Sequence, residues 1–440
     1  MSVPSLYLHV PFCRARCAYC AFSSTVSSEA TMERYLGALD RELIAKGALK
    51  PRTVYIGGGT PTALPSRLLE RLLRIVRERS DLSALEEWTV EMNPGTGSEE
   101  TFGLLAAEGV TRISIGVQTF SPEGRTVLGR IHSPEDSNRA VRGAVKAARD
   151  AHAAGLFSVS LDLIFGWPGQ TEESWRRDLE TAVALEPDHV SAYSLSLEEG
   201  TPLARRVRAI SKGEGRGSDR ADLSEHGPTP WSRLPSVARA ETGRKGRAPA
   251  PSPPADLFPG EEENGNLVMP PPEEVADRYL ATIDFLESAG YPRYETSNFS
   301  RPGEECLHNV LCWEYCGYEG AGASACAFVD GERRENLRDL SRYLSAVEAG
   351  ESPVEGRERL DGLSRWGERA MLGLRLSRGV DLESFAREEG LSFDQAFADV
   401  LPGLERDGYL ERAAGRILLS RKALPVADSI LAEFVASPPG

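Results

Sequence analysis

Short apolar, β-branched runs recur along the first 196 of the 440 residues and alternate with amphipathic stretches. The expected strands are Ser5–Val10, Thr53–Ile56, Trp88–Met92, Arg112–Gln118, Val159–Phe165 and Val190–Leu197. Helical periodicity covers Thr31–Lys46, Ser66–Arg79 and Glu172–Leu185. Strands that alternate with helices predict parallel βαβ units. Six units favour an α/β fold with a partial (β/α)6 TIM-like barrel, whereas a closed eight-stranded barrel would need further strands after residue 273.

Residues 208–272 break this alternation. Of these 65 residues, 25 are Pro, Gly or Ser, so the segment cannot bury enough apolar surface to offset the entropy lost on ordering. We expect a disordered surface insertion, and a segment that docks a partner is the alternative reading.

Helical periodicity returns at Glu273–Ala289, which lies between Pro272 and Gly290. Residues 300–332 are expected to be irregular. The tail has helical patterns at 363–376, 381–389 and 393–406, followed by an expected hairpin between residues 409 and 419. We therefore expect a core barrel over 1–207, the insertion over 208–272, a barrel completion over 273–335, and a small C-terminal helical, winged-helix-like domain over 336–440.

The charge balance excludes some partners. The chain has 51 basic and 66 acidic residues and a net charge of −15, so neither nucleic acid nor an anionic membrane surface is an expected partner. No apolar run reaches the roughly 18 residues of a transmembrane helix. The N-terminus lacks the charged and apolar regions of a signal peptide. We expect a cytoplasmic protein that is not transmembrane.

The seven cysteines form two groups, at 13–20 and at 306–326. Such tight grouping is untypical of a disulfide framework, which spreads its cysteines over a small domain. Cys13, Cys17 and Cys20 have C-x3-C-x2-C spacing directly after the first expected strand. Three thiolates can bind three irons of a 4Fe–4S cluster and leave the fourth iron open to a chelating substrate. A zinc site or an incidental group of cysteines is the alternative.

The run from Tyr7 through Cys13 to Phe22 resembles the radical S-adenosylmethionine superfamily and, within it, the oxygen-independent coproporphyrinogen III oxidase-like group. Further runs agree with this resemblance because each ends or follows an expected strand: Gly57–Pro61, Glu91–Pro94, Gly116–Gln118 with the nearby Gly129–His132, Leu161–Pro168, and Ser196. In parallel βα folds, ligands bind beyond the carboxyl ends of the strands. We therefore expect these runs to form one rim.

The resemblance implies two cofactors, a 4Fe–4S cluster on Cys13, Cys17 and Cys20 and S-adenosylmethionine. The implied cofactor-binding residues are Tyr7, Tyr19, Phe22, Gly58, Gly59, Thr60, Glu91, Gln118, Arg130, Asp162 and Ser196. We expect the glycine turn to approach the ligand closely and to offer N–H donors. Taken singly, each polar residue in this set would more often be a surface or capping residue.

Two branches of the group differ in function, and three features resemble the HemW-type haem chaperone branch. Phe22 stands where the catalytic branch commonly has a further cysteine. Only four residues precede the first expected strand, whereas the catalytic branch has a longer N-terminal arm. Residues 308–313 resemble the His-Asn-x-x-Tyr-Trp motif of the chaperone branch. The resemblance implies a protein that binds haem or a porphyrin and delivers haem to haem-accepting proteins, with an electron donor as a further partner. A homodimer is compatible with this resemblance. The alternatives are a coproporphyrinogen III oxidase and a metal-stapled interaction protein that makes no use of S-adenosylmethionine.

The haem ligand is less defined than the cluster ligands. His308 is the candidate axial ligand because imidazole binds haem iron well; the alternative is a histidine that is hydrogen-bonded within a loop. Cys312 occupies the tyrosine position of the motif, and Cys326 stands where the branch usually has histidine. With Cys306 and Cys316 they form the second cysteine group. One hypothesis is that Cys312 or Cys326 offers a thiolate to haem or another metal; the other is that these cysteines are small buried hydrophobes.

Overall fold

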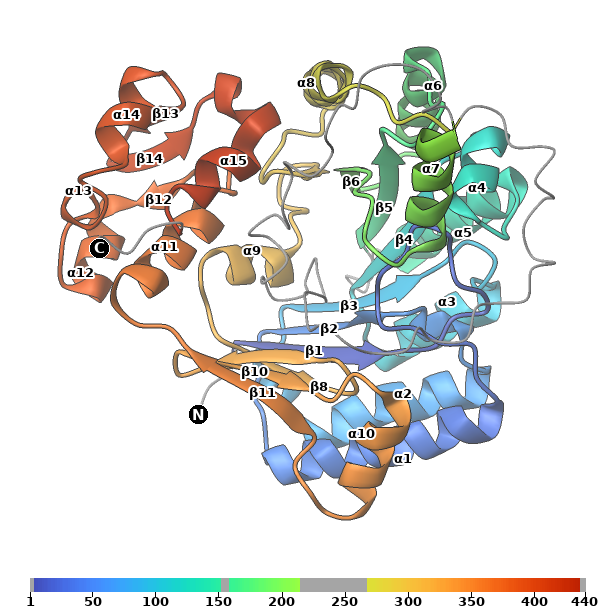
Figure 1. Ribbon diagram of the computed structural model, residues 1–440. Helices are drawn as coiled ribbons and strands as arrows, with labels where there is room; N and C mark the ends of the chain where they lie inside the picture. Colours follow the sequence, from blue (N-terminus) through green and yellow to red (C-terminus); the bar gives the residue numbers. More distant parts are fainter. Residues whose placement is uncertain (1–3, 152–157, 214–266, 436–440) are drawn as a thin grey trace.

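The computed structural model describes residues 4–151, 158–213 and 267–435. All six expected strands are confirmed, and consecutive strands pair in parallel. They are β1 (Ser5–Val10), β2 (Thr53–Gly58), β3 (Glu87–Met92), β4 (Arg112–Gln118), β5 (Ser158–Phe165) and β6 (His189–Ser194). The helices between and after them are α1 (Glu29–Lys46), α2 (Ser66–Arg79), α3 (Glu99–Glu108), α4 (Pro122–Leu128), α5 (Pro134–Ala151), α6 (Glu172–Ala184) and α7 (Pro202–Gly213). The α/β barrel-like fold is therefore as expected (Figure 1).

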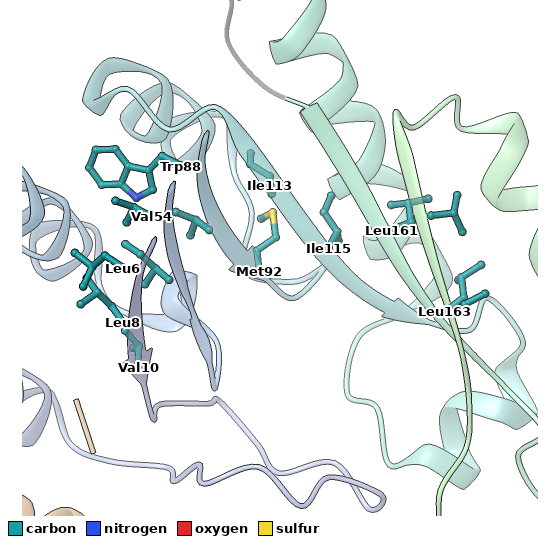
Figure 2. Close-up of a cluster of buried hydrophobic side chains, with 14 of the residues drawn as sticks. Leu6, Leu8, Val10, Val54, Trp88, Met92, Ile113, Ile115, Leu161 and Leu163 are labelled. Carbon is teal, nitrogen blue, oxygen red and sulfur yellow. The ribbon is translucent and has the colours of Figure 1, made fainter. Parts of the chain in front are cut away.

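The core lies on one face of these strands because apolar and polar residues alternate along them. Figure 2 shows apolar side chains on neighbouring strands, among them Leu6, Ile113 and Leu161. All three are fully buried, and they belong to one continuous core with the apolar residues of α1 and α2. Burying one such side chain contributes about 1.5–3 kcal/mol. The remaining strand positions, many of them polar, face the other way and line the barrel interior.

Residues after 273 extend both edges of the sheet. β7 (Asn298–Ser300) pairs antiparallel with β6, and β8 (Tyr318–Ala321) pairs parallel with β1. β9 (Cys326–Val329), β10 (Glu332–Asn336) and β11 (Val354–Arg359) follow β8 as antiparallel strands. In the described part of the chain the strand order runs from β11 to β7 and has two ends. The sheet is therefore open, and the added strands do not make a closed eight-stranded barrel.

The expectation that 300–332 is irregular was wrong. This stretch contains α9 (Leu307–Trp313), β8 and β9. β8 reads Tyr-Glu-Gly-Ala and has no apolar alternation of its own, so pairing with β1 makes it a strand. α9 lies between the barrel strands and the C-terminal domain (Figure 1).

The expected insertion lies mostly outside the described residues. At its start, α7 continues to Gly213, so the expected boundary after residue 207 falls inside a helix. At its end, Leu267 is buried, and the expected helix is confirmed as α8 (Pro272–Ser288).

The C-terminal domain begins later than expected. The boundary expected after residue 335 falls inside β10, and α10 (Leu340–Glu348) packs on α1 (Figure 1). After β11 come α11 (Gly362–Gly373), β12 (Val380–Asp381), α12 (Leu382–Glu389), α13 (Phe393–Ala396), α14 (Leu401–Arg406), β13 (Leu410–Ala413), β14 (Arg416–Leu419) and α15 (Ala427–Ala432). β12, β14 and β13 form a separate three-stranded sheet. Short 3-10 helices span Pro61–Ala63, Leu82–Ala84 and Arg421–Val426.

Two details of this domain follow from local chemistry. The helix expected over 393–406 is divided at residues 397–400 because Pro402 stands in the first turn of α14, where a proline ring is tolerated but cannot continue a preceding helix. The expected hairpin is confirmed, with Ala413 opposite Arg416. Its two loop residues, Ala414 and Gly415, both have positive φ, which suits a type I′ turn. None of the helices in the described ranges has the length and apolar character needed to cross a bilayer.

Candidate functional site

A cavity of about 460 Å³ opens into the polar interior of the barrel. Its wall includes the loop after β1, the carboxyl ends of β2 to β6, α9, β8 and part of the C-terminal domain. Twelve of the fifteen predicted site residues line it: Cys13, Cys17, Tyr19, Cys20, Phe22, Gly58, Gly59, Glu91, Gln118, Arg130, Asp162 and Ser196. The structure therefore brings the expected rim together. Tyr7, Thr60 and His308 are not among the lining residues.

The three cysteines of the first group stand on one loop, whose ends are tied together. The Cys13 N–H donates to the Thr25 carbonyl at 3.0 Å, and the Thr25 N–H donates to the Pro11 carbonyl at 2.7 Å. Cys13, Cys17 and Cys20 are partly exposed, and none is in a disulfide. Burial raises the pKa of the Cys20 thiol to about 12, so binding a metal there releases a proton.

These thiols fit a 4Fe–4S cluster better than a single ion. Among the described residues, no three His, Cys, Asp or Glu side chains are arranged to hold one metal ion together. A cubane cluster makes a different demand, because each thiolate binds its own iron. Three thiols that line one cavity from one loop meet that demand, and they would leave one iron of such a cluster without a cysteine ligand from this loop.

The glycine run after β2 packs directly against this loop. The Gly59 N–H donates to the Val10 carbonyl at 2.8 Å, and the Gly58 N–H donates to Glu91 at 3.1 Å. A Cβ on Gly59 would lie 2.7–2.8 Å from backbone atoms of Val10 and Phe12. Gly58 has a φ of 105°, which favours glycine. The turn therefore meets protein atoms closely, and the expectation that its N–H groups are free for a ligand is not met at these two positions.

Thr60 and Tyr7 support the site from behind the cavity wall. The Thr60 hydroxyl lies 3.6 Å from the Cys13 sulfur and accepts a 2.6 Å hydrogen bond from the Asn93 amide. Tyr7 is buried, and its hydroxyl lies 3.1 Å from Nδ1 of His9. Both residues can orient groups that line the cavity, but in this structure neither contacts it.

Two carboxyl groups reach the cavity from β3 and β5. Glu91 accepts hydrogen bonds from the Tyr55 hydroxyl at 2.8 Å and from Gly58, and burial raises its pKa to about 7. The Ser114 hydroxyl lies 3.0 and 3.1 Å from the two carboxylate oxygens of Asp162, whose pKa burial raises to about 6. Carboxylates held in this way suit a cationic group or sugar hydroxyls.

Arg130 joins the cysteine loop to two strand ends. Its guanidinium donates to the Cys17 sulfur at 3.1 Å, to the Asn93 amide oxygen at 2.7 Å, and to the Gly116 carbonyl. The next rim residue of β4, Gln118, has a φ of 70° at a register shift between β4 and β5. A non-glycine residue in this conformation is strained and commonly marks a functional position.

Polar side chains deeper inside the barrel also line the cavity, and they were not among the predicted site residues. The cavity is also lined by Tyr55, Thr89, Arg112, Ser114, Ser160, His189 and Ser191. Arg112 is 3% exposed, and its Nη2 has no hydrogen-bond partner. A signal for these residues was present, since the alternate positions of β3 to β6 are mostly polar, with Gly116 and Ile164 as exceptions, although parallel strands are usually apolar throughout. The predicted site residues lie at or beyond the strand ends, so these interior positions are not among them.

α9 carries the predicted haem motif and presents different residues to its two sides. His308 is fully buried, with Nδ1 2.9 Å from the Thr53 hydroxyl and its ring 5.0 Å from that of Tyr55. Burial lowers the pKa of His308 to about 3, so the ring is neutral. The structure does not bring this imidazole to the cavity. Asn309, Cys312 and Trp313 do line it.

A second part of the cavity wall is aromatic and basic. It includes Trp313, Tyr318 and Phe328, with Arg333 and Arg375 beside them. The Arg375 guanidinium lies over the Trp313 ring at 5.4 Å. Flat aromatic surfaces beside guanidinium groups suit a flat ligand that carries carboxylates. Of the second cysteine group, Cys306, Cys312 and Cys316 line the cavity and Cys326 does not.

Comparisons with known proteins agree on two regions. A sequence profile for the radical SAM superfamily matches residues 7–182, and a profile for the HemN C-terminal domain matches residues 360–426. The second match begins just after β11, where the separate C-terminal sheet and helices begin.

Two bacterial relatives that match nearly the whole chain carry the same name. The chain is 32% identical to Heme chaperone HemW of Lactococcus lactis over 98% of this chain and 97% of that protein. It is 30% identical to Heme chaperone HemW of Escherichia coli over 98% of both. The solved structure of coproporphyrinogen III oxidase (HemN) from Escherichia coli, described as a radical SAM enzyme, shares the fold, with a TM-score of 0.74, 21% identity, and coverage of 98% of this chain and 90% of that one.

Proposed function

The chain belongs to the HemW family of radical SAM proteins, and from this premise we propose that it is a haem chaperone. It binds haem in the cavity beside a 4Fe–4S cluster and S-adenosylmethionine, and it delivers the haem to haem-dependent proteins. The observation that carries the proposal is the continuity of one cavity from the cysteine loop to the aromatic wall. Haem and the cofactors then share one chamber.

The first half of the cavity suits the cofactors that the radical SAM family implies. Cys13, Cys17 and Cys20 would hold the cluster, which when bound supplies the electron for reductive cleavage of a carbon–sulfur bond of S-adenosylmethionine. Glu91 offers a carboxylate to a cationic group, and Asp162 offers one to ribose hydroxyls. Arg130 keeps Cys17 aligned with the ends of β3 and β4. Gln118 and Ser196 complete the rim on the side of β4 and β6.

The second half of the cavity suits haem. Trp313 and Phe328 offer flat apolar surface to the macrocycle, and Arg333 and Arg375 lie where propionates could pair with them. Both guanidinium groups already have carboxylate partners, Glu368 and Asp428 respectively. Binding a propionate would therefore mean sharing or exchanging a partner, which suits a carrier that must also release its cargo.

The proposal includes partners outside the chain. A haem-accepting protein would take haem from this cavity, and an electron donor would reduce the cluster. Both partners would be cytoplasmic, as would this protein. A homodimer is compatible with this function. In this proposal the barrel binds the cofactors. The C-terminal domain contributes Leu372, Arg375 and Asp428 to the half of the cavity that would bind haem.

One experiment separates this function from its rival. The cluster is reconstituted anaerobically, and the protein receives reductant and S-adenosylmethionine together with either hemin or coproporphyrinogen III. Stoichiometric haem binding, transfer to an apo haem protein and unchanged coproporphyrinogen support the chaperone. Formation of protoporphyrinogen IX would instead identify a coproporphyrinogen III oxidase, whose fold this chain shares.

A further inference from the structure

The orientation of α9 decides which motif residues can meet a ligand. Residues 309, 312 and 313 are spaced i, i+3 and i+4, so they share one helix face, and all three line the cavity. His308 and Leu311 are the buried residues of this helix. Two contacts hold that orientation: the N–H groups of Leu307 and His308 donate to Glu87 of β3 at 2.9 and 3.0 Å.

The cavity side of α9 also holds polar atoms without partners. The Tyr318 hydroxyl, the Trp313 indole nitrogen, the Asn309 amide oxygen and Nε2 of His308 are buried and have no hydrogen-bond partner. The first three belong to residues that line the cavity, and His308 does not line it. Tyr318 is 5% exposed and lines the cavity. Buried polar groups are normally satisfied, so three orphans around one part of a cavity indicate a ligand surface.

We propose that the Cys312 thiolate is the axial ligand of the haem iron in this protein. The inference rests on the proposed function, because it names the residue through which the cavity holds haem. On binding, the Cys312 thiol gives its proton to water, and the sulfur takes a coordination position that water or chloride occupied on ferric haem. No electron is transferred, and the iron remains ferric.

The surroundings favour Cys312 over the other candidates. It lies between Asn309 and Trp313 on the aromatic wall, where a macrocycle would stack. Cys316 follows the end of α9, where the charges of Glu314 and Arg52 act on it. His308 would reach the cavity only if α9 rotated away from Thr53 and Glu87.

The protonation of Cys312 agrees with a role that begins when iron binds. Burial raises its pKa to about 12, so the thiol is neutral until a metal binds it. Coordination to a metal deprotonates a thiol outright, and the released proton makes haem affinity increase with pH below that pKa. Cys306 is a weaker candidate because it is 3% exposed and its thiol lies 3.5 Å from Glu87.

The test uses the full chain with its cluster reconstituted, so that Cys13, Cys17 and Cys20 are occupied. Hemin is titrated into the wild-type protein and into Cys312→Ser, with Cys316→Ser and His308→Ala as matched variants. Dithionite and carbon monoxide are then added, which convert the bound ferric haem to its ferrous–CO adduct. We expect wild type, Cys316→Ser and His308→Ala to show the red-shifted Soret band that a thiolate ligand gives this adduct. Cys312→Ser should lose that band and bind hemin about 10- to 100-fold more weakly, as metal sites do when a supporting residue is removed.

Several outcomes would overturn the assignment. Retention of the thiolate band in Cys312→Ser excludes Cys312, and its loss in Cys316→Ser instead assigns the other thiol. A wild-type spectrum without thiolate character that changes in His308→Ala assigns the imidazole and leaves haem binding intact. Failure of wild type to bind hemin at all contradicts the proposed function itself. Iron content and thermal unfolding of each variant exclude loss of the fold as the cause.

Discussion

The two cysteine groups are both clustered in the sequence, but they have different settings in the structure. Cys13, Cys17 and Cys20 stand on one irregular loop at the rim of the barrel, and all three line the cavity. The second group is spread over a helix start, a helix face, a turn and a strand, and Cys326 stays outside the lining. Spacing alone therefore describes the first group well and the second poorly.

The difference shows that the contacts around a cysteine decide whether its thiol can bind a ligand. The first loop is contacted directly by the glycine turn and by Arg130, which lies 113 residues from Cys17 in the chain. The second group depends on how α9 is rotated, and that rotation follows from contacts with β2 and β3. The same residue type is a ligand set in one place and a mixture of structural and binding residues in the other.

The largest expected effect concerns the first group. A Cys13/Cys17/Cys20→Ala variant should lose the iron–sulfur cluster completely, because no protein ligand remains on the loop. Iron and acid-labile sulfide analysis after anaerobic reconstitution measures this. A Cys306/Cys316→Ser variant should keep full cluster content. If both variants retain cluster-level iron, the separation of the two groups fails.

A second experiment disturbs only the support of the first loop. Gly59→Ala should destabilise the fold by about 1–3 kcal/mol, because its Cβ would meet backbone atoms of Val10 and Phe12 that cannot move easily. Cluster content should fall while hemin binding persists. Urea denaturation measures the change in free energy of unfolding. The matched control is Gly103→Ala on the open side of α3, where nothing lies within 4 Å and alanine should stabilise slightly.

The two sides of the cavity should also respond differently to pH near neutrality. Only the ionised form of Glu91 attracts a cationic group, and its pKa is about 7. S-adenosylmethionine affinity should therefore rise about tenfold between pH 6 and pH 8, in step with the ionised fraction. Titration calorimetry on cluster-loaded protein measures it, and Glu91→Gln should bind weakly at both pH values.

Ionisation of the Glu91 carboxyl has the opposite effect on the stability of the protein without S-adenosylmethionine. Because the folded chain holds the Glu91 proton more tightly than the unfolded chain, whose carboxyl titrates near 4.5, this group lowers the free energy of unfolding as pH rises from about 4.5 through 7. Glu91→Gln should remove this group's contribution to the decrease of the free energy of unfolding with pH. An unchanged slope in the variant would contradict the raised pKa.

The smallest effect separates a structural cysteine from the proposed haem ligand. Cys306→Ala removes the contact of a buried thiol with Glu87 and should lower the free energy of unfolding by about 1 kcal/mol. The hemin spectrum and the cluster content should not change. Loss of hemin binding in this variant would instead assign the haem ligand to Cys306, at the start of α9.

Much of the fold was predictable because the signals are local. Apolar runs located β1 to β6, and the periodicity of α2 and the pattern of the hairpin around Ala414 matched the structure closely. β8 could not be predicted, because it has no strand pattern and exists through pairing with β1. The interior polar residues were predictable in principle from the alternation along β3 to β6.

By itself, the sequence determined the alternation of six strands with helices, the cysteine loop and the set of residues at the strand ends. The strand-end residues come together because parallel strands place their carboxyl ends at one edge of the sheet. Only the tertiary structure decided which part of the haem motif can reach the cavity. Glu87 and Thr53 lie more than 200 positions before α9 in the chain, yet they turn His308 toward the core and leave Cys312 facing the cavity. The rotation of a short helix depends on such distant partners, and spacing within the helix cannot reveal them.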